Sequence, residues 1–211
     1  MRAIPRMVTA FLLLFMTAVA AHAIDVSAAS AVLYEAETGR ILFSKNAEQQ
    51  RPIASTTKIM TALLVVEHGG LDETVTIRKE CTGNEGTSLY LKPGEQLTVR
   101  TLLYGLMLQS GNDAAEVLAC HVAGDIPSFV AQMNARAQEL GMTHTRFLNP
   151  HGLPAEGHGA SALDMARLTA AAMQNEDFRA VVSAKSYSAE GHTFTNHNRL
   201  LRMREEIDGV K

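Results

Sequence analysis

The most apolar helical segment between residues 24 and 211 reads STTKIMTALLVVEHGG, from Ser55 to Gly70. Good helix formers follow Ser55, and apolar residues recur at the spacing of one helical face: Ile59, Ala62, Leu63 and Val66. The two glycines at the end of the segment are suited to ending a helix. The segment therefore predicts an apolar helix that begins at a serine.

Ser55 and Lys58 are three residues apart, a spacing that places both side chains on one side of a helix, one turn apart. A serine becomes a good nucleophile when a base takes its proton, and a lysine whose pKa is lowered by burial can be that base. Ile53, Ile59 and Met60 are candidates for the apolar surroundings. The first turn of the helix also favours a developing oxyanion, with the Ser55 N–H expected as one donor.

The S-x-x-K pattern is weak evidence by itself, because a chain of this length contains about one by chance. The alternative is an N-cap serine followed by a solvated lysine. A second pattern, Ser110-Gly111-Asn112, places a hydroxyl and an amide in a tight turn, and its alternative is a simple interhelical loop. The same S-x-N form occurs in Ser44-Lys45-Asn46, ahead of Ser55. The order of the motifs, ending in Lys211 after Asp208-Gly209-Val210, favours function over coincidence.

The rest of the sequence predicts helices in the middle and strands at both ends. Expected helices cover Thr98–Leu108, Asp113–Val122, Phe129–Leu140 and a stretch from a capping-box pattern at Ser161 to about Gln174. Expected strands cover Ala29–Tyr34, Arg40–Lys45, Lys185–Thr195 and Ile207–Lys211. This order indicates an α+β fold, an antiparallel sheet with a mostly helical insertion, rather than alternating βαβ units.

The motifs resemble those of serine penicillin-binding enzymes and β-lactamases, which share the order S-x-x-K, S-x-N and K-T-G. The resemblance is closest to low-molecular-mass D-alanyl-D-alanine carboxypeptidases. It extends over further stretches: Gly86-Thr87-Ser88, Leu91-Lys92-Pro93-Gly94-Glu95, Gln109 to Ala114, Pro150-His151-Gly152-Leu153 and Asn196 to Leu201. It implies a penicillin-binding transpeptidase or β-lactamase-like fold, with a sheet part at 24–51 and 176–211 and a helical part at 52–175.

The resemblance also implies residue roles. Ser55 would be the nucleophile, Lys58 its base, Ser110 a proton-relay partner, Asn112 a substrate-binding amide and Lys211 a substrate-binding cation. His151 would border the site. The implied activity is removal of the terminal D-alanine from peptidoglycan stem peptides through an acyl-enzyme, without a cofactor and with β-lactams as covalent inhibitors.

Lys211 is the last residue given, so the Thr and Gly of K-T-G do not follow it. We therefore expect a partial catalytic domain, truncated at its C-terminus and a poor enzyme as it stands, with membrane association through a missing C-terminal region. One alternative is a non-catalytic wall-binding relative. Another is a β-lactamase, although residues 147–153 contain no glutamate that could serve in rapid deacylation.

The first residues have the features of an export signal. Arg2 and Arg6 precede an apolar run from Met7 to Ala20, and Ala21-His22-Ala23 has the form of a cleavage site. A membrane anchor is the alternative, but the run is shorter than the roughly 20 residues that span a bilayer. We expect residues 1–23 to be removed, and the protein to act in the periplasm or on the outer face of the cytoplasmic membrane.

Composition excludes some other functions. The net charge of -3 becomes more negative once the two arginines of residues 1–23 are removed, which argues against nucleic-acid binding. The eight histidines show no zinc-ligand spacing, so no metal site is expected. Cys120 is expected in the core and Cys81 in polar, exposed surroundings. A disulfide between them is an open alternative that the sequence does not favour.

Overall fold

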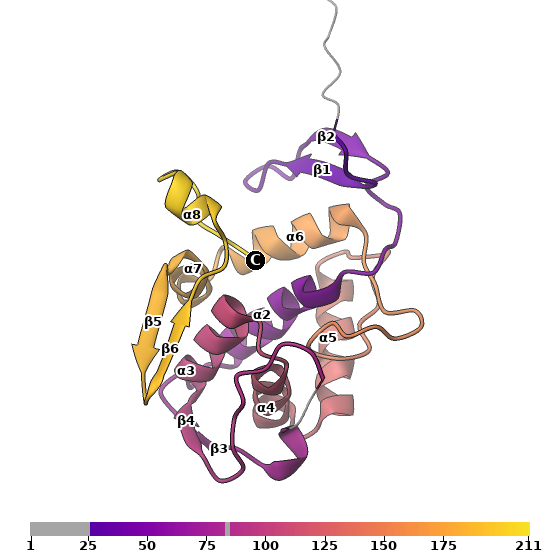
Figure 1. Cartoon of the computed structure of the whole chain (residues 1–211). Helices are drawn as coiled ribbons and strands as arrows, with labels where there is room; N and C mark the ends of the chain where they lie inside the picture. Colours follow the sequence, from indigo (N-terminus) through magenta and orange to yellow (C-terminus); the bar gives the residue numbers. More distant parts are fainter. Residues whose placement is uncertain (1–25, 83–84) are drawn as a thin grey trace, which may run out of the picture.

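The computed structural model describes residues 26–82 and 85–211 of the 211-residue chain. The expected export signal, residues 1–23, lies outside the described residues. Within them, helices form the centre of the molecule and short antiparallel strand pairs lie around it (Figure 1). This is the α+β arrangement that the sequence predicts.

The N-terminal hairpin joins β1 (Ala31–Tyr34) to β2 (Ile41–Lys45). The strands are antiparallel, with Ala31 opposite Lys45, and Gly39 takes a positive φ of 74° in the turn between them. One face of β1 lies against α6 (Ala162–Ala172). The predicted hairpin is therefore confirmed.

Helix α2 (Lys58–His68) is the central element of the core. It follows a 3-10 turn, η1 (Ala54–Thr57), and ends at Gly69, whose φ is 84°. Residues 58–66 are all buried, so the helix is covered on every side rather than on the one face that its pattern indicated. Four helices contact it: α4 (Asn112–Ala123), α5 (Ile126–Glu139), α6 and α7 (Glu176–Ser183). Figure 1 shows α2 enclosed among them.

The helices that enclose α2 begin at recognisable caps. Thr98 accepts a hydrogen bond from the Thr101 N–H at the start of α3, and Asp125 does the same for Ser128 at the start of α5. The predicted Ser161 cap is confirmed, because its side chain accepts from the Asp164 N–H. The bounds are α3 (Val99–Tyr104), the π-helical turn η3 (Gly105–Gln109), α4 (Asn112–Ala123), α5 (Ile126–Glu139), α7 (Glu176–Ser183) and α8 (Leu200–Met203).

Several elements differ from the sequence expectations. The antiparallel pair β3 (Thr74–Thr76) and β4 (Gln96–Thr98), and the 3-10 turn η2 (Lys79–Cys81) between them in the sequence, were not predicted. The predicted strand region at 185–195 is confirmed as the hairpin β5 (Ser186–Ala189) with β6 (His192–Thr195). Residues 207–211 form no strand, so that prediction is wrong. Gly209, at φ 125°, interrupts the extended run, and each described strand pairs with a single partner strand.

No single helix in the described ranges is long and apolar enough to cross a membrane. Helices α4 and α5 meet the length and composition criteria only as a pair, and they are bent by 84° relative to each other.

Candidate active site

Ser55 lies in η1 and Lys58 is the first residue of α2, so the two side chains fall on the same side of one continuous helical segment. The Lys58 Nζ is 3.5 Å from the Ser55 Oγ. Ala54, directly before the serine, has a positive φ of 44°, which is uncommon for a residue with a side chain. The strained residue sets the direction in which η1 presents Ser55.

Lys58 has no exposed surface. Its Nζ donates to the Asn112 Oδ1 and to the His151 carbonyl, both at 2.7 Å. The pKa of Lys58 is lowered to about 7, chiefly because burial disfavours the ammonium form and also because the positive charge of Lys211 is nearby. A neutral amine has two N–H donors and one lone pair, so the two short contacts leave the lone pair for the Ser55 hydroxyl.

The loop 149–153 closes over the start of α2 and supplies one of these contacts. The Thr61 hydroxyl donates to the Pro150 carbonyl at 2.6 Å, one residue before the carbonyl that Lys58 uses. Gly152 has a φ of 92°, and a Cβ at this position would lie 1.8 Å from the Ala54 carbonyl oxygen. Only glycine therefore allows the loop to approach η1 this closely.

Two buried histidines support this loop through their rings. The His151 Nδ1 accepts from the Leu153 N–H at 3.1 Å, and its Nε2 lies 3.3 Å from the Glu116 carboxylate. The His158 Nε2 lies 2.9 Å from the Thr57 hydroxyl. Burial, together with the charge of His151, lowers the pKa of His158, which favours its neutral form. His151 therefore borders the site through its carbonyl, while its ring is turned toward Glu116.

The second motif lies at the junction of η3 and α4. Ser110 has a left-handed backbone, with φ 65°, and its N–H donates to the Gly105 carbonyl five residues earlier, as in a π-turn. Asn112 is the first residue of α4, and its Nδ2 donates to the Glu85 carbonyl at 2.6 Å while its Oδ1 accepts from Lys58. The amide side chain therefore connects the base to the segment 85–91.

The Ser110 Oγ is buried and has no hydrogen-bond partner among residues 26–82 and 85–211. A buried hydroxyl without a partner is unusual and calls for an explanation such as a catalytic role or a ligand. The structure thus brings together the side chains of Ser55, Lys58 and Asn112. It does not form a hydrogen bond from Ser110 to any of them.

Asp113 holds the segment that faces Asn112. Its carboxylate accepts from the N–H groups of Leu89 and Leu91 and from the Ser88 hydroxyl, at 2.7 to 3.1 Å. Asp113 was not selected from the sequence, although it directly follows the S-x-N motif at the first turn of a predicted helix. A carboxylate at that position is a signal for backbone N–H partners.

Lys211 approaches the site from the far end of the chain. Its Nζ donates to the carbonyls of Leu106 and Met107, at 3.3 and 2.9 Å, in the π-helical turn that precedes Ser110. These carbonyls lie near a helical C-terminus, where a cation is favoured. Although the residue as a whole is exposed, burial of the ammonium group lowers the pKa of Lys211 to about 8.

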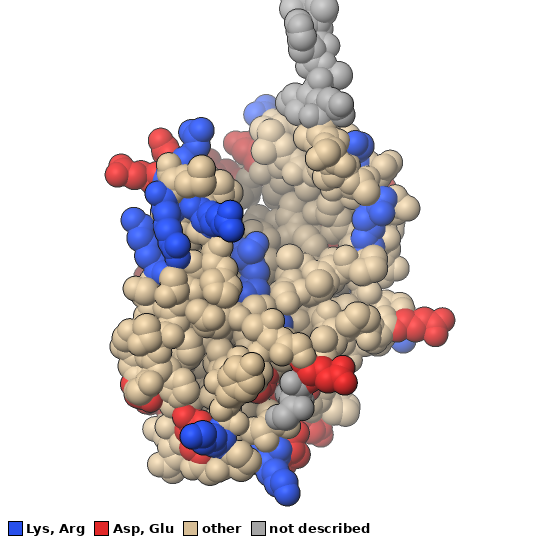
Figure 2. All heavy atoms as spheres, viewed as in Figure 1, with Lys and Arg blue, Asp and Glu red and all other residues tan. Residues whose placement is uncertain are grey.

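A hollow of about 1010 Å³ adjoins these residues. It lies between the β1–β2 hairpin and α8, and its lining includes Thr56, Ile59 and Lys211 (Figure 2). Figure 2 also shows Lys and Arg side chains at the α8 side of the hollow, with Asp or Glu side chains farther out on the same side. An anionic group entering the hollow would therefore meet positive charge.

The arrangement can support acyl transfer. A hydroxyl lies beside an amine that is deprotonated near neutral pH, and an amide and a second cation lie close to that amine. In the described parts of the chain, no group of three or more His, Cys, Asp or Glu is placed to hold a metal ion.

A family model described as D-alanyl-D-alanine carboxypeptidase, Peptidase_S11, matches residues 17–211. The chain is 37% identical over 196 residues to the D-alanyl-D-alanine carboxypeptidase DacF of Bacillus subtilis, covering 87% of this chain and 50% of the relative. It is 38% identical over 222 residues to DacC of Escherichia coli, covering 96% and 55%. The chain thus spans about half the length of the curated relatives it matches.

Solved structures are similar over most of the chain. Penicillin binding protein 5 from Haemophilus influenzae aligns with a TM-score of 0.81 and 32% identity, over 89% of this chain and 57% of that one. The Streptomyces K15 DD-transpeptidase aligns with a TM-score of 0.83 and 34% identity, over 89% and 80%. Both structural similarities confirm the fold class that the sequence predicts.

Proposed function

Because the chain belongs to the Peptidase_S11 family of D-alanyl-D-alanine carboxypeptidases, we propose that the protein removes the terminal D-alanine from peptidoglycan stem peptides through an acyl-enzyme. The observation that carries this proposal is the environment of Lys58. Its amine is fully buried, has a pKa of about 7 and lies 3.5 Å from the Ser55 hydroxyl. A serine with such a neighbour is an activated nucleophile.

In the first half-reaction, the Ser55 Oγ attacks the carbonyl carbon of the penultimate D-alanine while its proton passes to the Lys58 Nζ. The carbon–nitrogen bond then breaks, and the leaving D-alanine takes that proton on its amine. The product is an ester between the peptide and Ser55. In the second half-reaction, water attacks the ester, Lys58 takes a proton from the water, and the Ser55 oxygen leaves as a hydroxyl.

The neighbouring residues have separate roles in this proposal. Asn112 holds Lys58 through its Oδ1 and has an amide suited to a peptide backbone. In this proposal the Ser110 hydroxyl, which has no hydrogen-bond partner among residues 26–82 and 85–211, relays a proton to the leaving amine once a substrate is bound. Lys211 contributes a positive charge that can attract the terminal carboxylate of the stem peptide.

A β-lactam would react by the same first step, because its strained amide takes the place of the scissile bond and its fragment stays attached. We therefore include penicillin binding in the proposed function. The cell-wall substrate lies outside the cytoplasm, which agrees with the export signal proposed for residues 1–23. We also propose that residues 24–211 are part of a carboxypeptidase catalytic domain, in which residues 52–175 supply most of the helices and the two flanking segments supply the hairpins β1–β2 and β5–β6.

The test is covalent labelling of the purified full-length protein by benzylpenicillin, read by intact-protein mass spectrometry and followed by peptide mapping. We expect one penicillin per chain, attached at Ser55, and no adduct in Ser55→Ala. Ser44→Ala is the matched control, since Ser44 lies exposed on β2 in the other S-x-N pattern, and it should label as the parent does. The parent and Ser44→Ala should also release D-alanine from a peptide ending in D-alanyl-D-alanine, and Ser55→Ala should not. An adduct that persists in Ser55→Ala would remove this serine from the proposal.

A further inference from the structure

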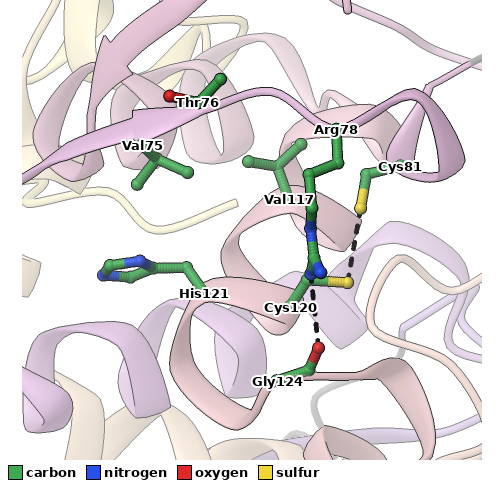
Figure 3. Close-up of a pocket in the computed structure, with 8 residues that line it drawn as sticks. All are labelled: Val75, Thr76, Arg78, Cys81, Val117, Cys120, His121 and Gly124. Atoms are coloured by element: carbon green, nitrogen blue, oxygen red, sulfur yellow. Dashed lines mark hydrogen bonds between the residues drawn. The ribbon is translucent and has the colours of Figure 1, made fainter. Parts of the chain in front are cut away.

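The two cysteines meet near the C-terminal end of α4, the end opposite Asn112. Cys81 lies in η2 and Cys120 in the last turn of α4, 39 residues apart in the sequence, and the Cys81 thiol donates to the Cys120 Sγ at 3.4 Å (Figure 3). Cys81 is only 2% exposed, so the prediction that it lies in exposed surroundings is wrong. The polar residues beside it face solvent, while the turn of η2 directs the thiol against α4.

A cavity of about 290 Å³ opens onto this pair. Its lining includes both cysteines, Arg78, Val117 and His121. Cys120 is partly exposed, whereas Cys81 lies behind it in the core. A small reagent entering the cavity would reach the Cys120 sulfur first.

Arg78 supplies a positive charge at the same place. Its guanidinium donates to the Gly124 carbonyl at 3.3 Å and lies beside the Cys120 sulfur (Figure 3). The pKa of Arg78 is raised above its ordinary value, chiefly by the charge that a Cys120 thiolate would carry. Thiolates, rather than thiols, attack disulfides.

We propose that Cys81 and Cys120 are a dithiol that closes to an intramolecular disulfide, fastening η2 to α4. The geometry is close to that product: the sulfur atoms are 3.4 Å apart, and each must move by less than about 1 Å to reach bonding distance. This inference does not depend on the proposed carboxypeptidase activity. It assigns a modification site at the opposite end of α4 from Asn112.

The chemistry is thiol–disulfide exchange with a small or protein disulfide as the oxidant. The Cys120 thiolate attacks one sulfur of the oxidant, forming a mixed disulfide and expelling a first thiolate. Cys81 then loses its proton and attacks the Cys120 sulfur, expelling a second thiolate. Two protein thiols thus lose two electrons and two protons, and the oxidant is reduced to two thiols. Burial raises the pKa of the Cys81 thiol, so we expect the second step to be the slower one near neutral pH.

The test uses oxidised glutathione as the disulfide. The purified protein is incubated with oxidised and reduced glutathione in varied ratio, and the reaction is quenched in acid. Free thiols are then alkylated, and the mass of the intact protein is measured by mass spectrometry. We expect the oxidised chain to be lighter than the reduced chain by two hydrogen atoms and to take up no alkylating agent. After proteolytic digestion it should give one cross-linked peptide pair containing both cysteines. We also expect its midpoint of thermal unfolding to rise by about 5–15 °C above that of the reduced chain.

Two single variants separate the steps. Cys81→Ser should stop at a stable glutathione adduct on Cys120, because the resolving thiol is absent. Cys120→Ser should stay unmodified at Cys81, because that thiol is buried. The variant with both substitutions should show no redox-dependent change in its unfolding midpoint. Three results would overturn the inference: a parent chain that stays reduced in excess oxidant, one that accumulates the glutathione adduct, or one that links to a second chain.

Discussion

The two ends of helix α4 carry different chemistry. At the first residue, Asn112 connects a buried lysine to the backbone of a separate segment through contacts of 2.6 and 2.7 Å. In the last turn, Cys120 shares a single contact of 3.4 Å with Cys81 and faces a cavity. The first end is held by several hydrogen bonds to backbone groups, which fixes the geometry of a proton transfer. At the second end, the two sulfur atoms lie close enough for a covalent bond to form after a small movement.

The largest contrast should appear between a substitution of Lys58, which contacts the first residue of α4, and a substitution of Cys120 in the last turn of α4. Lys58→Met keeps an unbranched side chain but removes the base, so the rate of penicillin acylation should fall about 10²- to 10⁴-fold. Cys120→Ala, at the other end of the helix, should leave this rate within about twofold, because no reacting group of the site contacts it. Stopped-flow or quenched mass spectrometry of the acyl-enzyme measures both rates. Equal rates in Lys58→Met and the parent would contradict the role of Lys58.

The structure also predicts that Lys58→Met lowers the stability of the folded chain. The lysine is fully buried, so replacing it leaves the Asn112 Oδ1 and the His151 carbonyl without their donor. Each buried acceptor without a partner costs about 1–3 kcal/mol. Thermal unfolding of Lys58→Met therefore has to accompany the rate measurement, and the rate should be compared at a temperature where both proteins are folded.

The second contrast compares two glycines with positive φ. Gly152→Ala would place a Cβ against the Ala54 carbonyl, at 1.8 Å, and force the loop away from the serine. Gly124→Ala, at the C-terminal end of α4, meets nothing within 4 Å and bears only the backbone cost, about 1–2 kcal/mol. We expect Gly152→Ala to lower the unfolding midpoint further and to slow acylation, while Gly124→Ala keeps the parent rate. Similar losses in the two variants would show that close packing against Ala54 is unimportant.

The smallest effect concerns the pH dependence of acylation. The neutral form of Lys58 is the base, so the rate should rise with pH up to about 7 and then level off. The charge of Lys211 contributes to lowering the pKa of Lys58, so Lys211→Gln should move this rise to higher pH. Arg78→Gln, beside the cysteines, should leave the rise in place. A rise that does not move in Lys211→Gln would mean that burial alone sets the pKa.

The titration of Lys58 should also make the stability of the folded chain depend on pH. The pKa of Lys58 is about 7 in the folded chain and ordinary, near 10.5, when the chain is unfolded. Between these values the unfolded chain binds the extra proton, so the contribution of Lys58 to stability increases as the pH rises from about 7 toward 10.5.

Local patterns predicted much of the candidate site. The spacing of Ser55 and Lys58 predicted that they share one side of a helical segment, and the S-x-N motif was placed correctly between two helices. The burial of Lys58, however, depends on contacts with Asn112 and with the His151 carbonyl, 54 and 93 residues away. Contacts at that separation leave no trace in helical periodicity. The close approach of Gly152 to η1 is hidden for the same reason.

The unpredicted elements have local explanations. Strands β3 and β4 have three residues each, too few to show an alternating pattern. Helix α7 did carry a signal, since Asn175 caps it and two acidic residues occupy its first turn. The exposed position assumed for Cys81 was taken from its polar neighbours, whereas a single 3-10 turn sends adjacent side chains in different directions.

The π-helical turn η3 constrains where an alignment of related sequences can place a gap ahead of the S-x-N motif. Each helical residue advances the chain by about 100° and 1.5 Å, so the wider turn changes the phase at which the following residues leave the helix. Removing one residue between Gly105 and Gln109 would restore an ordinary α-helix and rotate Ser110 and Asn112 away from Lys58. A gap of one residue there would leave the S-x-x-K and S-x-N motifs readable in the sequence while separating them in space.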